Sequence, residues 1–136
     1  MIRGIVPPWQ ALMDEQFPRA LRDRLVELRR AIHAEPELAF QEHRTSERLE
    51  QALVELVGGD VKSVAGTGLT LRIPGRNRSA PTVAVRGDMD ALPIQEDTGL
   101  PFASQTPGVM HACGHDIHAT WAVGAGALLA AEPAEG

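Results

Sequence analysis

Hydrophobic residues recur at helical spacing early in the chain. Leu21, Leu25, Leu28 and Ile32 are separated by four, three and four residues, and charged residues stand between them. This pattern predicts an amphipathic helix. We expect it to end before Pro36, because the residue that precedes a proline is driven away from helical dihedral angles.

A second helix is predicted to begin at Thr45 or Ser46 and to end at the glycine pair 58–59. Either hydroxyl group can cap the N-terminus of a helix, and glycine commonly follows a helix end. The helix would bury four apolar side chains, those of Leu49, Leu53, Leu56 and Val57.

The pattern after this helix changes to one that is typical of β-strands. Leu69, Leu71 and Ile73 alternate with polar residues, which predicts a strand with one face toward solvent. Residues 82–86 form a short run of β-favouring residues that leads into the acidic segment 88–90. We expect this run to be an interior strand of a sheet.

The last third of the chain predicts a loop followed by a helix. Residues 93–110 hold three prolines and two glycines, as a loop would. The helix after them has a face of mostly small residues, which would let its backbone lie close to a sheet. That face comprises Ala119, Ala122, Val123, Gly126 and Leu129. Helices and strands in this order predict an α/β layer fold, preceded by an irregular lead-in over residues 1–18.

Composition and charge exclude several classes of partner. The 136 residues are 43% hydrophobic and 23% charged, which suits one domain with a modest core. The formal net charge is -5 and no cluster of Lys and Arg stands out, so we expect no nucleic-acid partner. No run approaches the roughly 20 apolar residues that cross a bilayer, and the N-terminus does not resemble a signal peptide. These features predict no membrane partner and a cytoplasmic location.

The densest chemical feature is a group of five potential metal-binding side chains within eight residues. They are His111, Cys113, His115, Asp116 and His118. Thiolate and imidazole are good zinc ligands, and residues two apart in an extended loop project to the same side. We therefore expect Cys113 and His115 to share a metal ion, with Asp88 and Asp90 at the end of a nearby strand.

A simpler interpretation of each residue remains open at this point. A single histidine is usually a surface or hydrogen-bonded core residue, and a single buried cysteine usually packs as a small hydrophobe. Two ligands are also only half of a tetrahedral zinc site. Four further residues are interpreted as solvated side chains of a helix face and a turn, namely His33, Glu35, Glu37 and Glu42.

Two segments resemble signature motifs of the M20 peptidase family. They are residues 86–96, Arg-Gly-Asp-Met-Asp-Ala-Leu-Pro-Ile-Gln-Glu, and residues 108–118, Gly-Val-Met-His-Ala-Cys-Gly-His-Asp-Ile-His. The closest resemblance is to the amidohydrolase branch, which includes hippurate hydrolases, N-acyl amino acid amidohydrolases and auxin-conjugate hydrolases. Residues 28–38 also resemble the N-terminal helix and Pro-Glu-Leu turn of that branch.

The resemblance implies a zinc-peptidase-like α/β/α sandwich. Residues 19–136 would form the N-terminal part of its catalytic domain, truncated and without the lid domain. By this resemblance Cys113 and His115 are ligands of a two-metal centre that holds divalent ions, with zinc favoured over Mn, Co or Ni. Asp90 corresponds to a carboxylate beyond the ligands that orients them, as ligating imidazoles commonly require.

Other motif positions have supporting roles by the same resemblance. Asp88, Asp116 and His118 would lie around the ligands and support them. Gly87 stands where the family often has Ala, and the bulky Trp121 would alter the wall of the pocket.

The activity implied for a full-length protein is hydrolysis of an N-acyl amino acid by metal-bound water, and such a protein could form a homodimer. The family's catalytic Glu and its remaining ligands would follow Gly136, so we expect this chain alone to be inactive and to leave an open sheet edge. Two alternatives are a non-catalytic zinc-binding remnant and thiol catalysis. The latter would use Cys113 as nucleophile and His115 or His118 as base.

Overall fold

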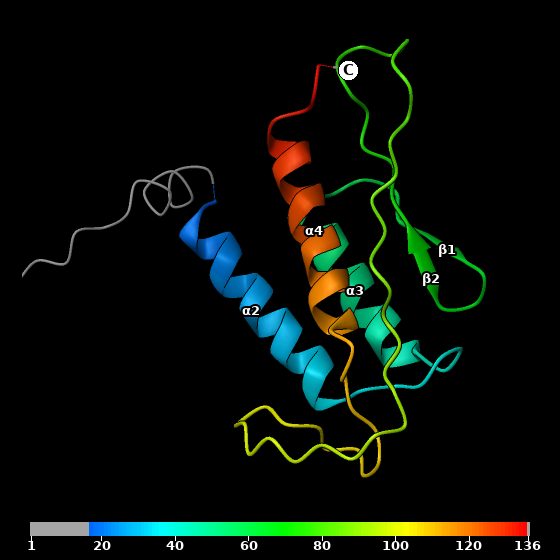
Figure 1. The fold of residues 1–136 in the computed structure, drawn as a ribbon. Coiled ribbons are helices and arrows are strands. Elements are labelled where there is room, and N and C mark those ends of the chain that lie inside the picture. The colour runs from blue at the N-terminus through cyan, green and yellow to red at the C-terminus, as the bar shows by residue number, and fades with distance from the viewer. Residues whose placement is uncertain (1–16, 136) are drawn as a thin grey trace, which may run out of the picture.

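Three helices pack together in the structure, a computed structural model that describes residues 17–135 (Figure 1). Helix α2 spans Arg19–Ala34, α3 spans His43–Leu56 and α4 spans His115–Ala131. Apart from residues 17 and 18, the predicted lead-in lies outside the described residues. None of the helices in residues 17–135 is long and apolar enough to cross a membrane.

The prediction for α2 is confirmed. Leu25, Leu28 and Ile32 are buried along one face of the helix, and Leu21 packs against the same core. The helix ends at Ala34, before Pro36 as expected.

Helix α3 is confirmed as an element, but the prediction of its cap is wrong. It begins at His43, and Thr45 is fully buried inside its first turn. The carboxylate of Glu37 accepts hydrogen bonds from the Thr45 backbone N–H at 2.8 Å and from its hydroxyl at 2.9 Å. A side chain from the preceding turn therefore satisfies donors that a Thr or Ser cap would normally satisfy.

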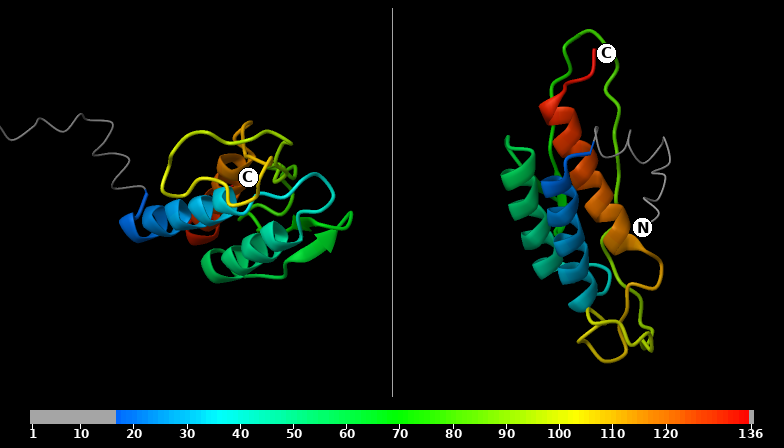
Figure 2. Two further views of the ribbon diagram at one scale, coloured as in Figure 1. Left: turned by 90° about the horizontal axis from the view of Figure 1, so that it is seen from below. Right: turned by 90° about the vertical axis from the view of Figure 1, so that its left-hand side faces the viewer.

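Helix α4 packs against both other helices, and the views in Figure 2 show the three running alongside one another. The core between them contains Leu25, Leu49 and Val123, with smaller residues filling the gaps. At Gly124 an added Cβ would lie 2.8 Å from Cδ1 of Leu25, so any side chain here would require Leu25 to shift.

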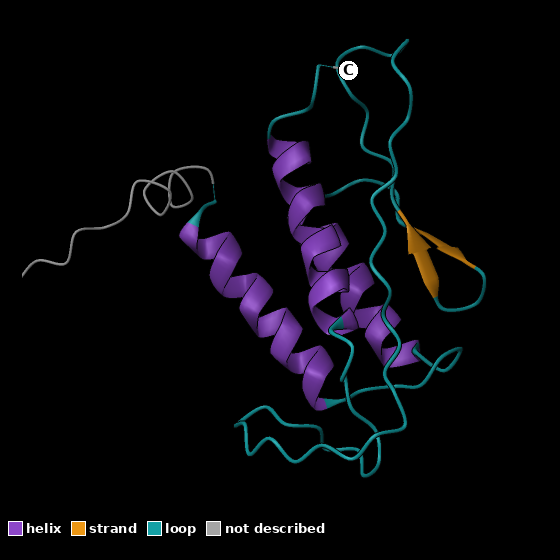
Figure 3. Cartoon of the chain, in the orientation of Figure 1, coloured by secondary structure: helices purple, strands orange, loops and turns teal. Residues whose placement is uncertain are grey.

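The strand predictions are only partly met. The described residues contain one antiparallel hairpin, β1 (Lys62–Val64) with β2 (Gly68–Thr70), in which Ser63 pairs with Leu69. The strand predicted from residue 69 to residue 73 stops at Thr70, and residues 82–86 form no strand. Figure 3 shows this stretch as a loop beside α4. A strand requires a hydrogen-bonded neighbour, and no backbone amide of residues 82–90 donates to another backbone group in the described chain.

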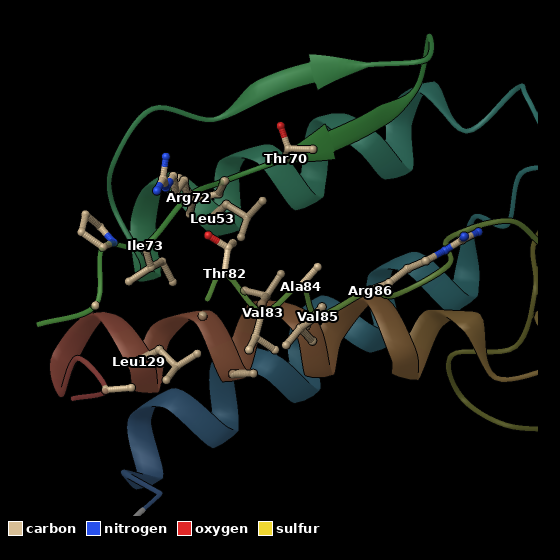
Figure 4. A pocket seen from close by; sticks show the side chains of 18 of the residues that line it. Leu53, Thr70, Arg72, Ile73, Thr82, Val83, Ala84, Val85, Arg86 and Leu129 are labelled. Carbon is tan, nitrogen blue, oxygen red and sulfur yellow. The ribbon is translucent and has the colours of Figure 1, made fainter. Parts of the chain in front are cut away.

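A trough of about 1120 Å³ lies where the sheet was expected. One wall is the predicted small-residue face of α4, including Ala122, Gly126 and Leu129, and the opposite wall is the extended segment of residues 69–87. Figure 4 shows Thr82–Val85 along α4, with Leu129 on the helix. The mixed helix and strand class is therefore confirmed, but most of the sheet layer of the sandwich is unpaired here.

Candidate metal site

The Cys-Gly-His turn leads directly into α4. His115 is the first residue of the helix, and Gly114 before it has φ of 85° in the left-handed region. The expectation of an extended loop from Cys113 to His115 is therefore wrong, because the backbone between them adopts a left-handed turn at Gly114. Glycine adopts this conformation without the steric cost that a side chain would add.

The ring of His115 is held by Asp90. Its Nδ1 lies 3.0 Å from Oδ1 of Asp90 and 3.0 Å from the backbone oxygen of the same residue. Both oxygens can only accept at neutral pH, so Nδ1 donates, and the proton is assigned from these acceptors. Nε2 is then left with a free lone pair, which is the form that binds a metal ion.

Backbone pairing brings the two motif segments together next to this contact. Leu92 and Met110 form an antiparallel bridge, with N–O distances of 2.9 and 3.0 Å in the two directions. Ala91 donates its N–H to the Glu37 oxygen at 2.8 Å, beside a parallel bridge between Leu38 and Ala91. Asp90 is therefore fixed from one side by the turn after α2.

Gly87 permits a further close approach. A Cβ at this position would lie 2.5 Å from the backbone oxygen of His118 and 2.9 Å from Cα of Ala119. An alanine at position 87 would force this segment away from the backbone of residues 118 and 119. This glycine therefore brings the segment before Asp90 onto the first turns of α4.

The outer part of the site is exposed and charged. Arg86 donates to Oδ1 of Asp88 through Nε at 2.9 Å and Nη2 at 2.6 Å. This hydrogen bonding lowers the pKa of Asp88, and electrostatic interaction with His115 and His118 lowers it further. Asp88 therefore lies within electrostatic reach of both histidines.

An array of three rings continues along α4 from the candidate ligand. The ring centroid of His118 lies 5.7 Å from that of His115 and 6.2 Å from that of Trp121. Trp121 is 67% exposed, so it extends the surface around the site as its sequence position suggested.

Asp116 lies on the other side of the helix, in the core. It is fully buried, and its Oδ2 lies 2.7 Å from Nδ1 of His33 and 2.7 Å from Nε of Arg29. Nε2 of His33 lies 3.3 Å from Oε1 of Glu96. Asp116 therefore contacts α2 directly, and His33 connects it to the 93–110 loop.

The interpretation of four residues as solvated side chains is largely wrong. His33 is 2% exposed and Glu42 is 7% exposed, and Glu42 accepts a hydrogen bond from Thr67 Oγ1 at 2.7 Å. Glu37 is also mostly covered, whereas Glu35 is half-buried and pairs with Arg48 at 2.7 Å. Their partners lie far along the chain or in the next element, so local periodicity gave no sign of their burial.

His111, one of the five potential metal-binding side chains in the sequence, is a buried imidazole. Neither ring nitrogen has a hydrogen-bond partner among the described residues, and burial lowers its pKa to about 4. Asp116 and Asp90 oppose this shift, whereas His33 and His115 add to it. The ring is therefore neutral at pH 7 and lies between the core cluster and the candidate ligands.

The donors present fit a soft divalent metal ion. The thiol of Cys113 is free and exposed, and His115 offers an oriented Nε2. Within residues 17–135 no group of three or more His, Cys, Asp or Glu side chains is arranged to hold a metal ion, so the chain offers a partial donor set. The thiol alternative gains no support, since no imidazole hydrogen-bonds the Cys113 sulfur in the described chain.

The fold and the site define an α/β protein with two candidate metal ligands at the N-terminus of a helix. The sequence model of Peptidase family M20/M25/M40 matches residues 84–136. A dinuclear metal-binding M20 peptidase from Bacillus subtilis superimposes with a TM-score of 0.79 at 42% identity, over 86% of this chain and 33% of that chain. This chain belongs to the M20 peptidase family.

Curated relatives share this similarity over a limited part of their length. N-acetylcysteine deacetylase of Bacillus subtilis (strain 168) is 45% identical over 121 residues, which are 86% of this chain and 31% of that protein. Thermostable carboxypeptidase 1 of Saccharolobus solfataricus is 43% identical over 114 residues, which are 82% of this chain and 28% of that protein. The chain thus spans about a third of the length of the curated relatives that it matches.

Proposed function

We propose that this chain supplies part of the active site of a metal-dependent amidohydrolase that acts on N-acyl amino acids. The observation that carries the proposal is the contact of His115 Nδ1 with Asp90, which leaves Nε2 free to bind a metal ion. Similarity to a deacetylase of an N-acyl amino acid and to a dinuclear metal-binding peptidase supports the same assignment.

In this proposal Cys113 and His115 are two ligands of a divalent ion, with zinc favoured for a thiolate and imidazole pair. A bound ion of this kind would polarise the scissile carbonyl and acidify a water molecule. Asp90 holds the tautomer of His115 and increases the basicity of Nε2. Asp88, His118 and Trp121 line the approach to these ligands, where a small acyl amino acid would bind.

We also propose that the chain by itself does not turn over substrate. Asp88 is engaged by Arg86 and Asp90 by His115, so neither carboxylate is free to act as a general base. The described residues also provide fewer than three clustered ligands. The non-catalytic zinc-binding alternative makes the same prediction for the isolated chain, and only a protein with the remaining family motifs would separate the two.

Titration with Co²⁺ tests the ligand assignment, because a cobalt–thiolate bond gives an ultraviolet charge-transfer band. We expect the band in the wild-type chain and its loss in Cys113→Ser, with affinity reduced about tenfold or more in His115→Gln. His43→Gln, at an exposed histidine of α3, is the matched control and should bind as wild type does. Absence of the band in the wild type, or unchanged binding in both variants, would refute the assignment.

An activity assay with the same zinc-loaded samples tests the remaining claims. Neither N-acetylated amino acids nor dipeptides should be hydrolysed above the rate of buffer with zinc. Turnover of either substrate would overturn the proposal of inactivity, and a preference for dipeptides would favour peptidase chemistry. A cytoplasmic location, a homodimer of the full-length protein and the lack of a nucleic-acid partner stay predictions from the sequence.

A further inference from the structure

The end of α2 and the turn after it contact both halves of the candidate metal site. The backbone oxygen of Glu37 accepts from Ala91, next to Asp90, and the backbone oxygen of Ala34 accepts from Gln105 at 2.8 Å. The side chain of His33 reaches Asp116, next to His115. Residues 33–37 therefore contact Ala91, which follows Asp90, and Asp116, which follows His115.

The contact between His33 and Asp116 is a buried, charge-assisted hydrogen bond. Nδ1 of His33 lies 2.7 Å from Oδ2 of Asp116, and the side chains are 3% and 0% exposed. Nη2 of Arg29 also lies 3.2 Å from this nitrogen. Arginine can only donate a hydrogen bond. If Nδ1 of His33 donates to Asp116, it cannot also accept from Arg29, so the shorter contact with Asp116 is the hydrogen bond.

The geometry of the helix makes this bond important for His115. Consecutive residues of an α-helix point about 100° apart, so the side chains of His115 and Asp116 leave the first turn of α4 in different directions. Asp116 is directed to α2, and His115 is directed to Asp90. Fixing Asp116 therefore fixes the rotation of the turn that carries His115.

Nε of Arg29 lies 2.7 Å from the same Asp116 oxygen, so two side chains of α2 hold this turn. Gly114, which precedes the helix, has no side chain to cap it, and no side-chain cap bond is present there. Asp116 is the acidic residue of the first turn, and its carboxylate faces α2 and the core. The orientation of the turn thus depends on tertiary contacts with α2.

We propose that His33 is a positioning residue that holds Asp116 and thereby sets the tautomer and direction of the His115 ring. The inference deepens the proposed function and rests on it for the role of His115 as a ligand. The effect on the ring itself does not require a metal ion, so it can be measured separately.

Three variants of the full chain separate positioning from packing. In His33→Asn the side-chain amide nitrogen lies near the former Nδ1 and keeps a donor for Asp116, whereas in His33→Gln it lies near the former Nε2 and faces Glu96. Asp116→Asn removes the charge but keeps the size of the side chain. His43→Gln is again the exposed control, and amide spectra report whether each variant is folded.

The readout is the ¹⁵N NMR signal of the His115 ring in the metal-free chain. We expect the wild type, His33→Asn and His43→Gln to show Nδ1 protonated and Nε2 unprotonated. In His33→Gln and Asp116→Asn the signal should shift toward that of the exposed His43 ring, and Co²⁺ affinity should fall about 10- to 100-fold.

The inference is overturned if folded His33→Gln or folded Asp116→Asn retains the wild-type His115 signal. It is also overturned if His33→Asn loses that signal as fully as His33→Gln, since shape alone would then explain the effect. If one variant does not fold, the other still decides. Failure of the wild type to bind Co²⁺ would refute the proposed ligands but leave the ring measurement intact.

Discussion

At the scale of single residues, the helix contact at Gly124 depends on the absence of a side chain. An added Cβ would lie 2.8 Å from Leu25 Cδ1 in the centre of the core, where neighbouring side chains are closely packed. Leu25 is buried in this core, so a shift of its side chain would disturb the packing around it.

We therefore expect Gly124→Val to lower the free energy of unfolding by about 1–3 kcal/mol through overpacking, measured by urea denaturation. Ala125→Val is the matched control, because Ala125 lines the trough, where added methyl groups find space. Replacing Gly by Val gains helix propensity whereas replacing Ala by Val loses it, so propensity opposes the expected difference and cannot account for it. Equal stability of the two variants would contradict close packing at Gly124.

Individual site residues differ in how well the sequence alone predicted them. Asp90 and His115 were predicted to act together, because the motifs that carry them resemble those of a family. The burial of His33 was missed, since a histidine at the end of an amphipathic helix has the same local pattern whether or not a carboxylate covers it. Its partner Asp116 lies 83 residues away in the sequence.

At the scale of elements, the N-terminus of α3 depends on Glu37. Burial alone would raise the pKa of this carboxyl group, but hydrogen bonds from Thr45 and Arg44 outweigh burial and lower the pKa below its ordinary value of 4.5. A lowered pKa means that the ionised form is favoured by folding. The stabilisation is present above pH 4.5 and is lost as the pH falls through the lower pKa of the folded state.

We expect Glu37→Gln to cost about 1–2 kcal/mol at pH 7, because one accepting oxygen becomes a donor beside N–H groups. The difference from wild type should shrink below pH 4.5, as Glu37 becomes protonated in both states of the wild-type chain. Urea denaturation at several pH values measures this, with the exposed Glu47→Gln as control. A difference that does not vary with pH would contradict the role of the charge.

Helices were more predictable than strands in this chain. The period of Leu25, Leu28 and Ile32 is a local signal, and α2 forms on that face. Residues 82–86 carry an equally clear β-favouring composition, but a strand also needs a neighbour with which to exchange hydrogen bonds. No described segment lies beside residues 82–86 to form these hydrogen bonds. The composition therefore indicated an extended backbone but could not indicate whether a neighbouring strand is present.

At the scale of the whole molecule, the trough beside α4 leaves apolar side chains and unpaired backbone open to solvent. Val83 is 83% exposed and Val85 is 63% exposed, both in the extended segment shown in Figure 4. Unpaired, β-favouring segments of this kind are templates for pairing with another chain.

We expect the chain to self-associate at high concentration, and Val83→Lys to weaken association about tenfold, which is about 1.4 kcal/mol. Analytical ultracentrifugation over a concentration series measures the effect. Val54→Lys adds the same charge at an exposed site on α3, which is 56% exposed, and should leave association unchanged. A wild-type chain that stays monomeric throughout would show that the segment is protected in solution.

The hydrogen bond between His33 and Asp116 also constrains the order in which the protein can fold. It closes a loop of 83 residues, and such long loops carry an entropic cost that must be met before their contacts stabilise the chain. If His33 positions the His115 ring as proposed, the ring takes its orientation only after α2 and α4 have docked. Under the proposed ligand assignment, an unfolded chain would offer a metal ion only a Cys-Gly-His peptide without an oriented imidazole, so selective uptake of the ion would follow folding.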